Sequence, residues 1–150
     1  MMTTKININE KFSKFSEHWR PKIVAELNGQ EFKLAKIKGE YPFHAHEGED
    51  EMFFCWRGSF ILDFEDGESV AVGEGEAIVV PKGVVHRPRA EEECHIFLIE
   101  PKDVKNNGTA EVDAKYDAPM GEWVGCPMSF NINYQTVQSG GCQGCSSGWQ

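Results

Sequence analysis

The feature that most constrains the fold is a close succession of short apolar runs and turn residues between Lys22 and Pro101. Asn28-Gly29 and Asp66-Gly67 are two of the turns, and the first is typical of a type I′ hairpin. No helical period runs through this block, and many short strands at regular spacing predict an all-β antiparallel sandwich or barrel. The expected strands are 22–27, 31–38, 41–46, 51–57, 60–64, 68–72, 77–80, 84–90 and 94–100.

Two segments of different character flank the strands. A short helix or turn is expected near the start, with Asn9 as its cap and with Ile8, Phe12 and Phe15 packed on one side. From residue 123 to residue 150 there is no charged side chain. We therefore expect a barrel domain over residues 1–105 and an irregular extension over 106–150, which lies on the barrel or is partly disordered and is not a domain of its own.

The overall composition limits the classes of function. With 150 residues, of which 40% are hydrophobic and 26% charged, the chain suits one globular domain. A net charge of −9 without a lysine or arginine cluster disfavours nucleic-acid binding. No apolar stretch is long enough for a signal peptide or a membrane span, so we expect a cytoplasmic protein with reduced cysteines and no membrane partner.

Three of the five histidines stand at spacings that indicate a metal site. His44 and His46 are two residues apart on an expected strand, so their side chains project from the same face. Glu51 opens the next expected strand, and His86 follows the turn at 81–83. Three imidazoles and one carboxylate suit one divalent ion (Fe, Mn, Ni, Zn or Co) and leave one or two positions open. The alternative is ordinary hydrogen-bonded histidines.

Glu51 has three acidic neighbours that compete with it as the carboxylate ligand. Glu47, Glu49 and Asp50 lie in the loop just before it. Strand phase and spacing favour Glu51, and we expect the other three to form a solvated acidic lip.

Strand phase also predicts the lining of a pocket beside the metal. The side chains that share an inward face with Glu51 or His86 are Phe53, Cys55, Pro88 and Ala90. This apolar lining favours a small, partly hydrophobic organic ligand over a sugar phosphate, which needs arginine or lysine. We expect Cys55 to be a small buried hydrophobe and not a reactive thiol.

The same phase turns Phe54 and Trp56 outward. Either the N-terminal segment or the tail covers them, or they belong to a homodimer interface, and the two explanations are compatible. We expect a homodimer.

The tail carries three further cysteines, Cys126, Cys142 and Cys145. They are one thiolate short of a closed zinc site, and a chemically idle tail is preferred to a zinc site or a disulfide.

Two motifs carry a family resemblance. Gly39-x4-His44-x-His46-x4-Glu51-x6-Gly58 resembles the first motif of the cupin superfamily, and Gly75-x5-Pro81-x-Gly83-x2-His86 is similar to the second. Residues 5–19 also look like the lead-in of small bacterial cupins of unassigned function. The resemblance implies a jelly-roll barrel, or double-stranded β-helix, with motifs at 39–58 and 75–90 and with those three histidines and Glu51 as ligands.

The sequence departs from the cupin motifs in two places. Four residues separate Gly39 from His44, where five are frequent, and Ala90 stands where the second motif commonly has Asn. Since Asn is not a ligand, the predicted metal site is unaffected, but no pocket hydrogen bond follows from the family at that position.

Two kinds of function are compatible with this centre. One is a metal-dependent enzyme acting on a small organic substrate, a dioxygenase if iron is bound or an isomerase or hydrolase with other ions. The other is a non-catalytic binding or sensing module in which the metal anchors the ligand. A purely structural metal is the weakest alternative. No catalytic residue is assigned, since Glu49, Asp50 and His95 are unsupported candidates. Truncation after Lys105 is expected to leave the metal site intact.

Overall fold

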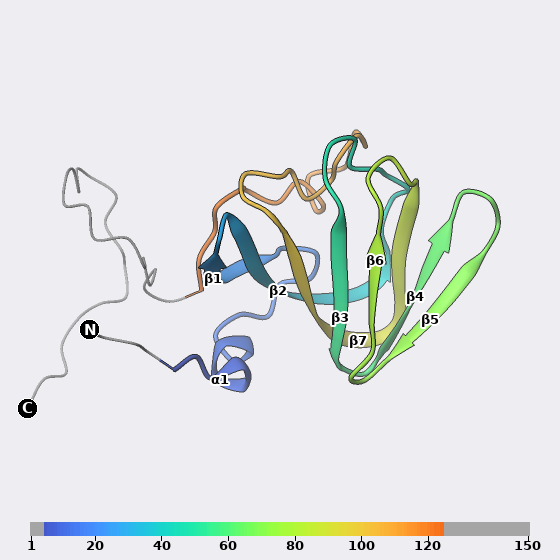
Figure 1. Ribbon diagram of the computed structural model, residues 1–150. Helices are drawn as coiled ribbons and strands as arrows, with labels where there is room; N and C mark the ends of the chain where they lie inside the picture. The colour runs from blue at the N-terminus through green and yellow to red at the C-terminus, as the bar shows by residue number, and fades with distance from the viewer. Residues whose placement is uncertain (1–4, 125–150) are drawn as a thin grey trace, which may run out of the picture.

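The computed structural model describes residues 5–124, and in that range the regular structure is almost entirely β-strand (Figure 1). The elements in chain order are α1 (Ile8–Phe12), β1 (Lys22–Leu27), β2 (Gln30–Glu40), β3 (Glu51–Arg57), β4 (Ser59–Phe64), β5 (Ser69–Gly73), β6 (Ala77–Val80) and β7 (His86–Pro101). Within residues 5–124, no helix has the length and apolar composition needed to cross a membrane.

The long strand β7 organises the barrel. It pairs antiparallel with β2 over nearly its whole length, with β3 through its C-terminal half and with β4 through its N-terminal half. The strand order is β1-β2-β7-β3-β6, and β4 and β5 branch from the other end of β7. Because β7 serves both parts of the sheet, the strands curl into a jelly-roll barrel with one enclosed interior (Figure 1).

Most expected strands are present, and two expectations are wrong. The runs 84–90 and 94–100 are not two strands, because one continuous strand, β7, extends from His86 to Pro101. The run 41–46 is not a strand, because Pro42 lacks the N–H that a ladder needs. Instead, His44 makes a single antiparallel bridge with His86, and each backbone N–H donates to the other residue's carbonyl, at 3.0 and 2.9 Å.

The N-terminal helix forms close to where the sequence placed it, but its cap is Asn7 and not Asn9. The Asn7 side chain accepts a hydrogen bond from the backbone N–H of Glu10 at 3.1 Å. Asn9 is used differently, since its side-chain oxygen accepts from the indole Nε1 of Trp56 at 3.0 Å. The helix therefore fixes the side chain of Trp56, one of the two aromatic residues that were expected to face outward.

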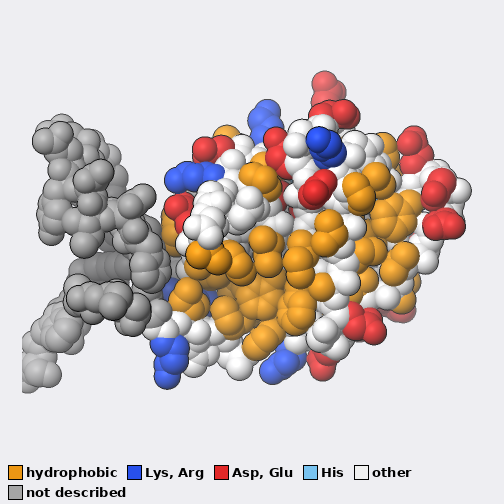
Figure 2. All heavy atoms as spheres, in the orientation of Figure 1, with side chains coloured by type: hydrophobic (Ala, Val, Ile, Leu, Met, Phe, Trp, Pro, Cys, Tyr) orange, Lys and Arg blue, Asp and Glu red, His pale blue; other side chains and the backbone are white. Residues whose placement is uncertain are grey.

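Apolar side chains pack on both sides of the sheet. Inside the barrel, Phe53, Phe60 and Ile96 belong to the larger buried cluster. A second cluster lies on the outer face, where the N-terminal segment packs against β1 and β2, and it consists of Phe12, Phe15, Val24, Leu34 and Val124. Figure 2 shows that apolar side chains continue across the outer face beyond this cover.

Residues 106–124 contain no helix or strand and run along the barrel surface. At their end, the Ile23 N–H donates to the Glu122 carbonyl at 2.7 Å, and the Val124 N–H donates to the Ile23 carbonyl at 3.1 Å. Earlier in the segment, the Tyr116 hydroxyl donates to the Glu40 carbonyl at 2.8 Å. This part of the expected extension lies on the barrel, whereas the cysteines at positions 126, 142 and 145 lie outside the described residues.

Candidate metal centre

The structure brings the four expected ligands together in the barrel interior. His44, His46, Glu51 and His86 are each 5% exposed or less. The Nε2 atoms of His46 and His86 both lie 3.3 Å from Glu51 Oε2. His44 stands opposite His86 in the bridge, with 4.5 Å between ring centroids, and contributes a ligand atom within 4.8 Å of those of Glu51 and His86.

Backbone carbonyls fix the orientation of two of the imidazole rings. Nδ1 of His44 is 3.0 Å from the Pro42 carbonyl, and Nδ1 of His86 is 2.9 Å from the Val84 carbonyl. Because a carbonyl only accepts, each Nδ1 must carry the proton, and a neutral ring then has its lone pair at Nε2. The lone pair of neutral His86 thus faces the Glu51 carboxylate, which is repulsive unless a proton or a metal cation lies between them.

His46 contributes a buried nitrogen without a hydrogen bond. Among the described residues, its Nε2 has no hydrogen-bond partner, although Glu51 Oε2 lies 3.3 Å away. A buried polar atom that lacks a partner is costly, and a bound cation removes that cost. Glu51 joins two groups of ligand atoms that lie within 4.8 Å of one another, one with His44 and His86 and one that includes His46. Three imidazoles and one carboxylate are residue types that fit a borderline divalent ion.

The protonation states of Glu51 and His44 also suit a metal ligand set. Burial would raise the pKa of Glu51, but His46 and His86 outweigh it and lower the pKa to about 2, so Glu51 is a carboxylate at neutral pH. Burial, aided by the neighbouring His86, lowers the pKa of His44 to about 4, which keeps that ring neutral. Carboxylate and neutral imidazole are the forms that bind metals.

A second carboxylate, which the sequence analysis missed, borders the centre. Glu100 is buried, and one of its oxygens lies within 4.8 Å of ligand atoms of His46 and Glu51. Burial, reinforced by the Glu51 charge, raises the pKa of Glu100 to about 7 despite its bond to Lys33. The alternation along this strand could have identified Glu100. Ile96 and Leu98 face inward, and Glu100 continues the same every-second-residue pattern.

A cavity adjoins the centre. Phe53 and Pro88 line it together with His44, Glu51, Trp19 and Tyr41, among others. Of the other two side chains expected to line it, Cys55 and Ala90, both are buried but neither borders the cavity. The Cys55 thiol instead donates to the Gly58 carbonyl at 3.3 Å and lies 3.7 Å from the Cys94 sulfur, inside the core.

The cavity is small. Its volume is about 30 Å³, which is more than the roughly 10–15 Å³ that one water needs. This volume has room for a few ligand atoms beside an ion.

The acidic loop before Glu51 lies at the surface. Glu47 and Asp50 are exposed and Glu49 is half-buried, while Asp50 accepts a hydrogen bond from the Lys82 backbone N–H at 2.9 Å. Glu47 and Glu49 border a surface hollow of about 320 Å³ that also reaches His46. Two acidic side chains therefore lie beside the surface hollow that reaches His46.

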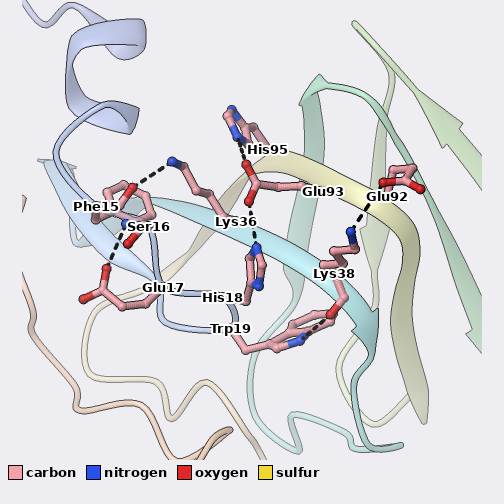
Figure 3. A network of polar contacts seen from close by, with 10 residues as sticks. All are labelled: Phe15, Ser16, Glu17, His18, Trp19, Lys36, Lys38, Glu92, Glu93 and His95. Carbon is pink, nitrogen blue, oxygen red and sulfur yellow. Dashed lines mark hydrogen bonds and ion pairs between the residues drawn. The ribbon is translucent and has the colours of Figure 1, made fainter.

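The two remaining histidines belong to a separate surface network. Figure 3 shows Glu93 between them, with its two oxygens 2.7 Å from His18 Nε2 and 2.9 Å from His95 Nε2. The His95 ring also stacks on Phe12, with 4.6 Å between centroids. Both histidines are bound to Glu93 and not to the centre, so the structure gives His95 no support as a catalytic candidate.

Comparisons with known proteins agree with this architecture. Residues 30–100, which include all four expected ligands, match the family model described as a cupin domain. The crystal structure of a cupin-2 domain containing protein from Shewanella frigidimarina is similar with a TM-score of 0.63 and 45% identity, covering 65% of this chain and 94% of that one. Protein NMB1881 from Neisseria meningitidis gives a TM-score of 0.62 and 39% identity, over 66% of this chain and all of its own (100%). Among curated proteins, the uncharacterized protein YdbB of Bacillus subtilis is 34% identical over 83 residues, 55% of this chain and 67% of its own.

Proposed function

This chain belongs to the cupin family, and on that premise we propose that it is a metal-dependent enzyme. Its buried centre of three histidines and one glutamate binds a divalent metal ion. The substrate is a small organic molecule, and the reaction is of the dioxygenase or isomerase type. The observation that carries the proposal is the buried Nε2 of His46, which has no hydrogen bond to any described residue and lies 3.3 Å from Glu51. We interpret this buried nitrogen as a ligand of the metal ion.

Contacts within the chain fix the orientation of two of the proposed ligands without a bound ion. Hydrogen bonds from Nδ1 to backbone carbonyls hold the rings of His44 and His86 in the tautomer that directs Nε2 toward Glu51. Such backbone partners are the usual second layer around metal-binding histidines. The divalent ion (Fe, Mn, Ni, Zn or Co) supplies Lewis acidity toward a substrate oxygen when bound, and in the case of iron also chemistry with O₂.

The cavity walls define what the substrate meets next to the centre. Phe53 and Pro88 contribute apolar wall, and Tyr41 lines the cavity beside His44, with 5.1 Å between the two ring centroids. Burial, together with the Glu51 charge, raises the pKa of Tyr41, so its phenol stays protonated. Tyr41 is therefore not available as a base, and its hydroxyl donates to the Tyr116 carbonyl at 3.3 Å.

A non-catalytic binding or sensing function is the second candidate. It is favoured by the wall of the cavity, where the polar side chains among the described residues are Tyr41, Asn106 and the proposed ligands His44 and Glu51. No independent acid–base pair faces the cavity in the part of the chain that the structure describes. Such a wall positions a ligand on an ion without an obvious proton-transfer pair.

The first test is the metal content of protein purified without a nickel column. We expect one equivalent of a divalent metal in the wild type and in His95→Ala, which removes a histidine of the separate surface network. His46→Ala should lose the metal and keep a β-rich circular dichroism spectrum. Full metal content in His46→Ala would refute the ligand assignment.

The second test separates the two functions. Bound iron with O₂ uptake on candidate phenolic or keto substrates, or isomerisation with another native ion, supports the enzyme. An organic molecule that co-purifies in stoichiometric amount and is released unchanged on denaturation supports the binding module.

A further inference from the structure

Three carboxylates lie in a row across the inner face of the sheet. Glu31 on β2 pairs with Glu100 on β7 in the ladder. Phe53 on β3 pairs with Leu98 on β7, and Met52 pairs with Ile99, so the same register sets Glu51 beside Glu100. All three glutamates are buried, each 4% exposed or less. Like charges on neighbouring strands repel, so this row needs positive charge to be stable.

Lys33 supplies only part of that charge. Its Nζ lies 3.2 Å from Glu31 Oε2 and 2.7 Å from Glu100 Oε1, and its side chain is 4% exposed. One lysine against three ionised carboxylates would leave two negative charges in the interior. A divalent cation beside Glu51 and Glu100 would balance them.

Lys33 bonds only one of the two oxygens of Glu100. Within residues 5–124, Glu100 Oε2 is buried and has no hydrogen-bond partner. A ligand atom each of His46, Glu51 and Glu100 lie within 4.8 Å of one another. Two atoms that bind one ion at about 2.1 Å can be up to about 4.2 Å apart, so these three are close to the spacing of shared ligands.

We propose that Glu100 is a fifth protein ligand of the metal centre, which then holds its ion with three imidazoles and two carboxylates. This proposal rests on the proposed function. Lys33 has a positioning role, since it occupies Oε1 and leaves Oε2 for the ion. A five-ligand set suits six-coordinate Fe²⁺ or Mn²⁺ better than tetrahedral Zn²⁺. It leaves one open position, so the substrate class is a molecule that binds the ion through a single donor atom.

A structural role for Glu100 within the lysine cluster is the competing explanation, and Glu31 provides the matched control. Both glutamates are buried, both bond Lys33, and both lie on the inner face. Of the two, Glu100 belongs to a group of candidate ligands. Glu100→Gln and Glu31→Gln therefore remove the same charge from the same cluster at different distances from the centre.

The experiment uses Mn²⁺ as the probe, with the full chain freed of metal. Titration calorimetry gives the Kd, and pulsed electron paramagnetic resonance in D₂O counts the exchangeable waters on the bound ion. In Glu100→Gln we expect the Kd to rise at least about tenfold and one water to be added. Glu31→Gln should keep the wild-type water count. Equal water counts in the wild type and Glu100→Gln would overturn the proposal.

The failure of this proposal is distinguishable from failure of the proposed function. If the wild type binds no Mn²⁺, or if His46→Ala binds it as well as the wild type does, the metal centre itself is wrong. If those two behave as expected and Glu100→Gln has the wild-type water count, only the role of Glu100 is wrong.

A measurement on unmodified protein covers the case in which Glu100→Gln does not fold. The infrared difference between the Mn²⁺-bound and metal-free wild type should contain shifted bands of two carboxylates. The shift of a single carboxylate would overturn the proposal.

Discussion

Gly108 passes so close to Ala45 that a methyl group on its Cα would collide with the Ala45 carbonyl group. The added carbon would also stand 3.2 Å from Nδ1 of His46. Next to it, Thr109 clamps the same stretch, since its backbone N–H donates to the Ala45 carbonyl at 3.0 Å and its hydroxyl accepts from the Ala45 N–H at 3.1 Å. Residues 108–109 therefore hold the backbone between His44 and His46.

Gly108→Ala should disturb both the fold and the centre. Because the clash is with backbone, we expect a loss of about 1–3 kcal/mol in the free energy of unfolding and weaker Mn²⁺ binding. Urea denaturation and Mn²⁺ titration measure the two effects. Gly121→Ala is the control, because Gly121 also has a positive φ, of 72°, but an added carbon meets nothing within 4 Å among the described residues. Wild-type metal affinity in Gly108→Ala would contradict the clamp.

These contacts change the expected outcome of truncation after Lys105. Such a chain loses Thr109, and it also loses Tyr116, whose carbonyl accepts from the Tyr41 hydroxyl at 3.3 Å. We now expect truncation after Lys105 to weaken metal binding, whereas truncation after Val124 keeps every described contact and should preserve it. Metal content by elemental analysis compares the two chains. Equal metal content would support the original expectation from the sequence.

The strands were predictable because their signals are local. The alternation in 51–57 matches β3 residue for residue, and Asn28-Gly29 forms the expected tight turn with positive φ at both positions, 51° and 78°. The error at 41–46 is also local, because Pro42 lacks the N–H that a strand ladder needs. The spacing of His44 and His46 was sufficient without that strand, because the bridge to His86 sets the position of the segment.

The rest of the site depends on contacts that no local pattern contains. The inward phase of Glu100 was readable, but its place beside Glu51 requires the register of β7 against β3. Strand phase placed Cys55 and Ala90 correctly on the inner side, yet which inward residues border a cavity depends on how the whole core fills. The contact of Gly108 with Ala45 joins residues that are far apart in the chain.

Asp63 should make stability depend on pH. Arg89 Nε at 2.8 Å, Ser69 Oγ at 2.6 Å and Arg87 Nε at 3.1 Å all donate to its carboxylate. These bonds, that of Arg89 above all, lower the pKa of Asp63 from 3.8 to about 2. A carboxylate with a lowered pKa stabilises the fold fully above its ordinary pKa, and the contribution disappears as pH falls through about 2.

Asp63→Asn should therefore destabilise the protein at pH 7 and less so in acid. The full shift would correspond to about 2.5 kcal/mol, and partial exposure of the two arginines reduces the expected loss to about 1–2 kcal/mol. Urea denaturation at pH 7 and pH 3 measures the difference from the wild type. Glu92→Gln is the control, since the Glu92 side chain is 88% exposed. A difference that does not shrink between pH 7 and pH 3 would argue against this role for Asp63.

The homodimer stays a prediction, and Val79 is the residue that tests it. Helix α1 accepts a hydrogen bond from the Trp56 indole through Asn9, but Phe54 packs on Phe97 with 5.6 Å between ring centroids. On β6, the strand next to β3, Val79 is 56% exposed. If two copies meet through this face, Val79→Asp buries an unpaired charge. That costs about 3 kcal/mol or more and raises the dimer Kd roughly hundredfold.

Analytical ultracentrifugation of the wild type and two variants checks this interface. Val70→Asp is the matched control, because Val70 on β5 is also exposed, at 38%, but lies on a different part of the barrel. We expect a dimer for the wild type and Val70→Asp and a monomer for Val79→Asp. A monomeric wild type would contradict the predicted homodimer, and a dimer that survives Val79→Asp would place the interface elsewhere. Because the variant adds one charged group at an exposed site, it should keep the wild-type Mn²⁺ affinity, which separates loss of the dimer from loss of the fold.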